Sequence, residues 1–303
     1  MEKAMKNKDS TVNCLLEKGG KRLLPYLLMS PTLIFIVLFL IVPLAFAFYC
    51  SLYRADYMQF SKFLGLGNYI DVLTDTEILK SIGRTFYVSG MSLVVSLIAG
   101  VALALCINAL SQKLAYIVQI IVLIPWVTSM IVAAMLWKWI FQDETGLLNY
   151  AISKIGLSKI GFLTDKNIAI YTLIFVLTWR VIGYVMVQVL AGLKSIPQEF
   201  EEASKIDGAN KWKLFWFIRF PLLKTPLTIS AIIVGLSNIN NLNVPLTLLA
   251  GGPGTSTMVV AIDVYRMSFT NYHFGESSAL SIVLCLINFL LAVIYIKAVK
   301  YEI

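Results

Sequence analysis

Long stretches of this chain contain no Asp, Glu, Lys or Arg, and they limit its fold more than any other feature. Arg22 and Arg54 enclose 31 such residues, and Lys224 and Asp263 enclose 38. A charge at the bilayer centre is costly, and a helix crosses the bilayer with about 20 apolar residues. The chain is 58% hydrophobic and 14% charged, whereas a soluble domain carries roughly 25% charged residues. These values exclude a disordered chain and favour a helical membrane protein over a soluble enzyme.

Six of the apolar stretches are long enough to cross a bilayer. We therefore expect an all-α polytopic membrane protein with six transmembrane helices. Residues 1–24 are expected to form a cytoplasmic tail, and residues 25–303 a single transmembrane domain. The fifth stretch is too long for one span, so its Gly251-Gly252-Pro253-Gly254 segment is expected to leave the helix. The expected spans lie near residues 26–50, 86–108, 115–138, 169–193, 226–249 and 277–297.

The positive charges predict the orientation of these spans. If the N-terminus lies inside, the inner segments together with Lys297 at the end of the last span carry 15 Lys and Arg against 8 Asp and Glu, and the outer loops carry 8 against 9. The positive-inside rule therefore predicts that both termini are cytoplasmic. Ala45-Phe46-Ala47 is similar to a signal-peptide cleavage site. The apolar run before it is longer than a signal-peptide core and contains Pro31 and Pro43, so an uncleaved helix is favoured.

The residues that usually carry catalysis or bind metals are scarce. His273 is the only histidine, and the four cysteines show no C-x-x-C spacing. The usual zinc ligand sets are therefore hard to build, as is a Ser-His-Asp triad away from residue 273. The chain contains no G-x-x-x-x-G-K-[ST] phosphate-binding loop. We expect no catalytic residue, no metal or other cofactor bound by this chain, and no nucleic-acid partner.

The inner segment 194–225 has the pattern of two short helices. Residues 198–206 are helix formers that follow Ile196-Pro197. Asp207-Gly208-Ala209-Asn210 predicts a turn in which Gly208 permits positive φ and Asn210 caps the next helix. Residues 211–219 then place Trp212, Phe215 and Trp216 on one face, and Phe220-Pro221 is expected to end the helix. The spacing alone fits an amphipathic element on the lipid surface equally well.

The same segment resembles the EAA loop of ABC importer permeases. The matching pattern is Glu202-Ala203-Ser204, three residues, Gly208, nine residues, Ile218, one residue, and Phe220-Pro221. Ser204 replaces the second Ala of the family pattern, and Phe220 replaces a Leu. The resemblance implies that residues 198–220 form a coupling loop that docks on an ATPase subunit. It implies that Phe200 and Ala203 face the ATPase groove, that Glu202 makes a charged contact, and that Asp207, Gly208 and Pro221 complete the motif.

Four further segments carry a second resemblance: Phe63-Leu64-Gly65-Leu66-Gly67-Asn68-Tyr69, Leu249-Ala250-Gly251-Gly252-Pro253-Gly254, Tyr265-Arg266 and Phe274-Gly275-Glu276-Ser277-Ser278-Ala279. They resemble the carbohydrate-uptake subgroup, of the maltose and glycerol-phosphate permease type, and its first permease subunit in particular. The resemblance implies a multi-pass protein of the cytoplasmic (inner) membrane. The implied partners are a second permease subunit, two ATPase subunits that use ATP and Mg, an external binding protein and a carbohydrate substrate.

Polar side chains within the spans are candidates for the substrate path. Asn238 and Asn241 share a face of the fifth span, and their amides suit sugar hydroxyls. Asn is also a common interhelical hydrogen-bonding residue, but the resemblance favours substrate contact because maltose-type permeases carry Asn in the matching helix. Arg180, Tyr184 and Gln188 share a face of the fourth span. They fit a path-lining cluster, and Arg180 fits a structural role equally well.

Three alternatives remain, one of them within ABC transport. The EAA pattern by itself cannot separate a sugar permease from one for polyamines, phosphate or a sugar phosphate, but the segments at 63–69 and 249–254 favour sugar. A membrane enzyme would need clustered carboxylates, His or Cys, and the sequence shows no such cluster. An ion-driven secondary transporter would usually carry acidic residues within its spans, and none of the expected spans contains Asp or Glu.

Overall fold

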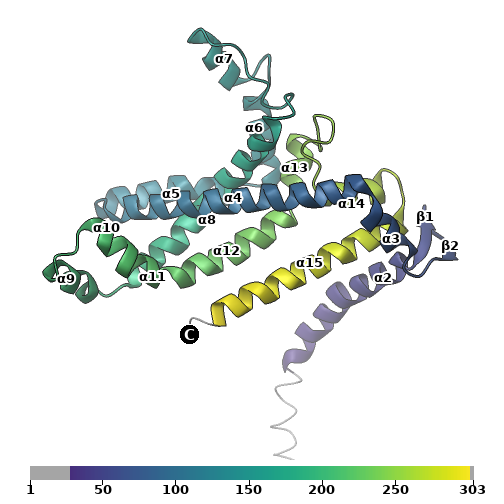
Figure 1. The fold of residues 1–303 in the computed structure, drawn as a ribbon, viewed down its shortest axis with the longest axis horizontal. Helices are drawn as coiled ribbons and strands as arrows, with labels where there is room; N and C mark the ends of the chain where they lie inside the picture. The colour runs from purple at the N-terminus through teal and green to yellow at the C-terminus, as the bar shows by residue number, and fades with distance from the viewer. Residues whose placement is uncertain (1–27, 301–303) are drawn as a thin grey trace, which may run out of the picture.

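The computed structural model describes residues 28–300 of the chain, and most of this part is helical (Figure 1). The predicted tail 1–24 lies outside the described residues. The longer helices are α2 (Val42–Ser51), α4 (Thr76–Asn108), α5 (Gln112–Val127), α6 (Met130–Ile140), α8 (Ala169–Ser195), α12 (Lys224–Ile239), α14 (Val260–Phe269) and α15 (Phe274–Lys300). The shorter ones are α3 (Gly67–Thr74), α7 (Leu147–Lys154), α9 (Gln198–Ile206), α10 (Lys211–Leu214), α11 (Phe220–Leu222) and α13 (Asn243–Leu248), with π-helical turns η1 (Val37–Ile41) and η2 (Phe215–Arg219).

Four helical segments are long and apolar enough to cross a membrane, namely Leu28–Ser51, Thr76–Asn108, Ala169–Ser195 and Phe274–Lys297. Two helix pairs also qualify, but each is bent: α5 and α6 meet at 97°, and the α10–α11 segment meets α12 at 62°. Within residues 28–300 the structure therefore has four candidate spans, or six if each bent pair counts as one. The expected helical membrane architecture is confirmed at this level.

The structure corrects the third and fifth expected spans. The stretch near 115–138 is two helices, because Thr128 and Ser129 are extended and Pro125 lies in the last turn of α5. The fifth span ends at Ile239, and α13 is a separate helix. The Gly251–Gly254 segment leaves the helix as expected, with positive φ at Gly251 and Gly254.

Helix α8 is the centre of the bundle and packs against α4, α5 and α12. In its most apolar window 61% of residues are buried, compared with 6% in Leu28–Ser51 and 11% in Phe274–Lys297. Small residues allow the close approach: a Cβ on Gly183 would overlap the Val122 carbonyl, and one on Gly100 would overlap the Val185 side chain. The two lightly buried helices are left to contact lipid or another chain.

Within residues 28–300 the all-α expectation holds except for one antiparallel hairpin, β1 (Tyr53–Asp56) and β2 (Gln59–Phe63). The hairpin, α3 and α14 lie at one end of the molecule, which we call the hairpin end (Figure 1). The segment of α9 and α10 lies at the opposite end, which we call the α9 end (Figure 1). Helix α4 runs along the bundle between them, whereas α6 and α7 project from its side (Figure 1).

Candidate functional site

The α9 end is built from local sequence signals. Helix α8 stops at Ser195 because Ile196, which precedes Pro197, is extended with ψ of 120°. The chain then forms α9, as the sequence predicted. Gly208 ends this helix with φ of +75°, and the Ala209 N–H donates to the Ser204 carbonyl at 2.9 Å. This is the Schellman arrangement that glycine favours at a helix C-terminus.

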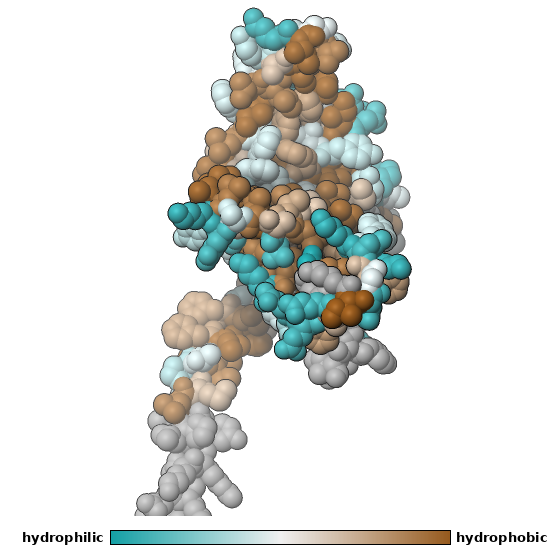
Figure 2. Space-filling view, turned by 90° about the vertical axis from the view of Figure 1, so that its left-hand side faces the viewer, coloured by the Kyte–Doolittle hydropathy of each residue, from teal (hydrophilic) through white to brown (hydrophobic). Residues whose placement is uncertain are grey.

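The candidate coupling residues on helix α9 are exposed at the surface of the described chain. The side chains of Glu202 and Ala203 are exposed, Phe200 is 54% exposed and Ile206 is 86% exposed. Ser204, in contrast, is buried. Figure 2 views the molecule from the α9 end and shows hydrophilic side chains gathered there, with a small hydrophobic area among them. An exposed helix with apolar residues on it is suited to bind a partner protein.

The second short helix begins as predicted but ends differently. Asn210 caps α10, because its side chain accepts a hydrogen bond from the Lys213 N–H at 2.8 Å. Trp212 and Trp216 form an edge-to-face pair with ring centroids 5.7 Å apart. Phe220-Pro221 does not end the helix: the π-helical turn η2 precedes it, and the chain continues to Leu222 before it bends into α12. A wide turn accommodates a proline, which lacks the N–H of a regular helix.

The predicted stripe on α8 exists, and two of its members are in contact. The Gln188 Nε2 donates to the Tyr184 hydroxyl at 3.2 Å. The Tyr184 ring stacks on Trp126, with centroids 5.3 Å apart and planes at 28°. Arg180 lies one turn before Tyr184 and is buried at 9% exposure. Its Nε has no hydrogen-bond partner within the described part of the chain.

The two predicted asparagines are buried and hydrogen-bonded inside the bundle. Asn238 donates through Nδ2 to the Ser92 hydroxyl at 3.1 Å. Asn241 accepts from the Val244 N–H at 3.1 Å, and its Nδ2 donates to the Met130 sulfur at 3.9 Å. Asn238 therefore joins α12 to α4. Asn241 lies after the end of α12, in the link to α13, so the two amides do not share a helix face as expected. No hydrogen bond joins them to the α8 stripe within residues 28–300.

Sequence reasoning did not identify Ser92, which connects three helices. Besides Asn238 of α12, Ser92 of α4 accepts a hydrogen bond from the Thr178 hydroxyl of α8 at 3.2 Å. Thr178 is two positions from Arg180, so the two side chains lie on different faces of α8. The available signal was the series of small polar residues on α4 at helical spacing, which are buried in the structure. This series comprises Ser81, Thr85, Ser89, Ser92 and Ser96.

Two arginines, one on α4 and one on α14, hold the Gly-Gly-Pro loop. Arg266 donates to the Ala250 carbonyl at 2.7 Å, and Arg84 donates to the Thr255 hydroxyl at 3.4 Å. Asp263 lies nearby on α14, and burial raises the pKa of its carboxyl above the usual range, although a hydrogen bond from Ser81 and the two arginines oppose this. The cluster fixes the loop against α4 and α14.

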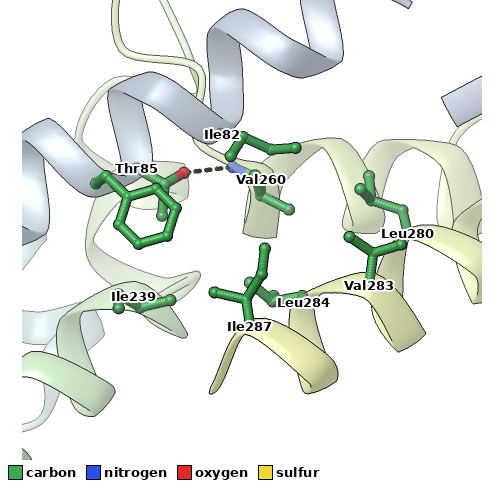
Figure 3. Close-up of a pocket in the computed structure, with 9 residues that line it drawn as sticks. Ile82, Thr85, Ile239, Val260, Leu280, Val283, Leu284 and Ile287 are labelled. Carbon is green, nitrogen blue, oxygen red and sulfur yellow. Dashed lines mark hydrogen bonds between the residues drawn. The ribbon is translucent and has the colours of Figure 1, made fainter. Parts of the chain in front are cut away.

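A small cavity between α4, α14 and α15 is a packing gap and not a solute site. Figure 3 shows Ile82, Val260, Leu280 and Ile287 converging from α4, α14 and α15, with Thr85 accepting a hydrogen bond from the Val260 N–H. The volume of the cavity is about 10 Å³, which is enough for about one water molecule. Among the described residues, no group of three His, Cys, Asp or Glu side chains is arranged to bind a metal ion.

Comparisons with known proteins find one family and several full-length relatives. Residues 92–299 match the family described as binding-protein-dependent transport system inner membrane component. The chain is 30% identical over 283 residues to the trehalose/maltose transport system permease protein MalF of Thermococcus litoralis, with 92% of this chain and 94% of the relative covered. It is 31% identical to the sn-glycerol-3-phosphate transport system permease protein UgpA of Agrobacterium fabrum, with 88% of this chain and 91% of the relative covered.

A solved structure has the same fold. It is a bacterial ABC transporter involved in the import of the acidic polysaccharide alginate, and one of its chains aligns with a TM-score of 0.81. The alignment covers 95% of this chain and 98% of that one, at 24% sequence identity. At this identity, the comparison supports the permease fold and leaves the solute open.

Proposed function

The chain belongs to the family of binding-protein-dependent transport system inner membrane components, and we propose that it is one of two permease subunits of an ATP-driven sugar importer. It is a multi-pass membrane transport subunit and not an enzyme. Its described candidate spans total six if the bent pairs are counted, and the charge distribution favours both termini inside. The names of its relatives, which include trehalose/maltose and glycerol-3-phosphate permeases, support a carbohydrate-type solute.

The α9 segment is the observation that carries this proposal. Its sequence has the spacing of the importer coupling motif, and its structure is a short exposed helix closed by Gly208. Because α9 is connected through short links to α8 and to α10, a force on it would reach the bundle. We infer that α9 docks on an ATPase subunit, with Phe200 and Ala203 in the contact and Glu202 at its polar edge. Asp207 and Pro221 complete the segment.

Two sets of polar side chains support a solute path along the bundle. The Arg180, Tyr184 and Gln188 stripe offers a cation, an aromatic ring and an amide on one face of α8. We assign this stripe to solute contact. Asn238 donates to Ser92 of α4, and Asn241 donates to Met130 of α6, so we assign both amides to shaping the path. Alternating access would open this path to one side of the membrane at a time.

Replacing Gly208 tests the coupling role. A tryptophan there must adopt a left-handed conformation, which costs roughly 1–2 kcal/mol for a non-glycine residue. No atom lies within 4 Å of the position of its Cβ, so the bundle is left undisturbed while the end of α9 changes. We expect the Gly208→Trp complex to assemble but to lose at least about 90% of solute-stimulated ATP hydrolysis, measured after co-purification from the native membrane.

Gly156 provides the matched control. It has φ of +79° and also has no atom within 4 Å of its Cβ position, but it follows α7, far from α9 in the chain. Gly156→Trp should keep solute-stimulated hydrolysis within about twofold of the unmodified importer. The proposal fails if the tagged chain purifies with no ATPase subunit. It also fails if Gly208→Trp and Gly156→Trp hydrolyse ATP equally well.

A further inference from the structure

Arg180 is a buried cation that has no partner in the described part of its own chain. Only 9% of its surface is exposed, and its Nε lacks a hydrogen-bond acceptor. No ion pair involving its guanidinium is formed among residues 28–300. Arg180 lies 11 residues after the start of α8 at Ala169, roughly 16 Å along the helix at 1.5 Å per residue. This depth is too great for its side chain to reach the end of the helix.

An unpaired guanidinium at this depth requires an anion from elsewhere. Arginine stays charged in proteins, and a buried charge without a partner is strongly unfavourable. Among the described candidate spans, acidic residues occur only at Glu77 and Glu276, in the first turns of α4 and α15. Asp263 lies on α14, at the hairpin end. The chain itself therefore supplies no carboxylate at the depth of Arg180.

The neighbours of Arg180 on the same face have the chemistry of a sugar site. Tyr184 follows one turn later and is stacked on Trp126, which is 43% exposed. Gln188 follows after another turn and hydrogen-bonds to the Tyr184 hydroxyl. Aromatic faces pack on the apolar faces of sugar rings, and amides bond to sugar hydroxyls. What Arg180 adds is a planar fork that binds a carboxylate through two parallel hydrogen bonds.

We propose that Arg180 binds the carboxylate of an acidic sugar, so that the solute of this importer carries a negative charge. This proposal rests on the function proposed above and deepens it. In the occupied site, the solute carboxylate would accept hydrogen bonds from the guanidinium, while Tyr184 and Gln188 contact the rest of the sugar. A neutral sugar would leave the guanidinium unpaired, which gives the site its selectivity.

The test uses the complete importer, purified with its partner permease and ATPase subunits in lipid nanodiscs. The probes are D-glucuronate and D-glucose, compared at equal ionic strength with sodium acetate as the carboxylate control. The measured quantity is the melting temperature of the complex as each probe is titrated, from which an apparent Kd follows. We expect glucuronate to bind at least about tenfold more tightly than glucose or acetate, as a charge-assisted hydrogen-bond pair allows.

Substitutions then locate the effect at Arg180. Arg180→Gln should raise the apparent Kd for glucuronate at least about tenfold. Arg180→Lys keeps the charge but loses the planar guanidinium, so its apparent Kd should lie between those of the unmodified complex and Arg180→Gln. Lys113→Gln removes an exposed cation at the start of α5 and should leave the Kd unchanged. If Arg180→Gln does not yield a folded complex, Arg180→Lys alone still tests the proposal.

Two outcomes would overturn the inference. The first is equal binding of glucuronate and glucose to the unmodified complex. The second is a glucuronate affinity that is the same in the Arg180 variants as in the unmodified complex. In either case a complex that still hydrolyses ATP retains the proposed importer function, whereas a chain purified without an ATPase refutes that function itself.

Discussion

At the scale of single residues, Asn68 shows how one side chain can hold a corner of the fold. It is 3% exposed, and its Nδ2 donates to the Ser51 carbonyl at 2.8 Å and to the Tyr53 carbonyl at 2.9 Å. Its neighbour Tyr69 shares a 2.6 Å hydrogen bond with the Ser51 hydroxyl. The two residues therefore join α3 to the corner between α2 and β1. In the segment 63–69, which resembles the carbohydrate permeases, Asn68 and Tyr69 therefore have a structural role.

We predict that Asn68→Ala destabilises the hairpin end. The substitution leaves two backbone carbonyls without this donor, and each unsatisfied buried group costs about 1–3 kcal/mol. The expected result is faster proteolysis of the loop at residues 57–58 in the purified complex, with ATP hydrolysis by the complex retained. Asn167→Ala, which changes an exposed asparagine in the loop before α8, is the control. Equal proteolysis of the two variants would contradict the prediction.

At the scale of elements, α8 is held by close backbone approaches as well as by apolar side chains. Gly183 lies against the Val122 carbonyl of α5, and Gly100 of α4 lies against Val185. Helices in a bilayer gain little from hydrophobic burial against each other, because lipid is equally apolar. Small residues compensate by bringing the helices close enough for extensive van der Waals contact. The position of α8, and therefore of the Arg180 stripe, depends on these contacts.

We predict different effects of alanine at two helical glycines. Gly183→Ala places a Cβ against a backbone carbonyl, which cannot move without shifting α5, so we expect a loss of about 1–3 kcal/mol from overpacking. Gly90→Ala adds a Cβ with no atom within 4 Å, and alanine is favoured over glycine in a helix by roughly 0.5–1 kcal/mol. The melting temperature of the complex should fall for the first variant and hold or rise for the second. Equal shifts would show that the α5–α8 contact is not tight.

The two bent helix pairs, α5 with α6 and α10–α11 with α12, also determine how the elements are arranged. Pro125 alone did not predict the break between α5 and α6, because membrane helices tolerate proline. The break turns α6 toward α13, and Met130 there lies next to Asn241 and Asn243. At the second bend, η2 carries the chain past Pro221 into α12. The first bend therefore brings α6 against the amides of Asn241 and Asn243.

At the scale of the whole molecule, two helices have apolar surfaces that the described part of the chain does not cover. Leu28–Ser51 and Phe274–Lys297 contact each other but leave most of their apolar surface uncovered. An exposed apolar surface of this size is compatible with lipid or with a second subunit, and not with water. The chain is therefore suited to exist within an assembly in the membrane.

We predict that both ends of the chain face the cytoplasm, which a labelling experiment can test. In a variant without the four natural cysteines, Lys159→Cys lies in the loop before α8, and Lys211→Cys lies at the start of α10. Both lysines are exposed. A membrane-impermeant maleimide should label Lys159→Cys in intact cells, and label Lys211→Cys only after the membrane is opened. The reverse pattern would invert the proposed topology and separate α9 from a cytoplasmic ATPase.

Local physical chemistry explains what was predictable from the sequence. An apolar run without charges forms a membrane helix because of its own length and composition, independently of its contacts with the rest of the chain. Pro197, Gly208 and Asn210 act on their immediate neighbours, so the end of α8, the turn and the cap of α10 were expected and found. The coupling role of this segment and the solute role of the α8 stripe stay predictions.

Contacts between distant residues were decided only by the tertiary structure. The hairpin turn uses Tyr57 and Met58 at positive φ, without the glycine or asparagine that usually marks such a turn. It is held from outside, since the Tyr57 N–H donates to the Tyr272 carbonyl at 2.9 Å and the two rings stack. Ser92 likewise depends on distant residues, because its hydrogen bonds join α4 to α8 and α12. Periodicity shows which residues share a helix face, but which helix packs on that face depends on the packing of the whole bundle.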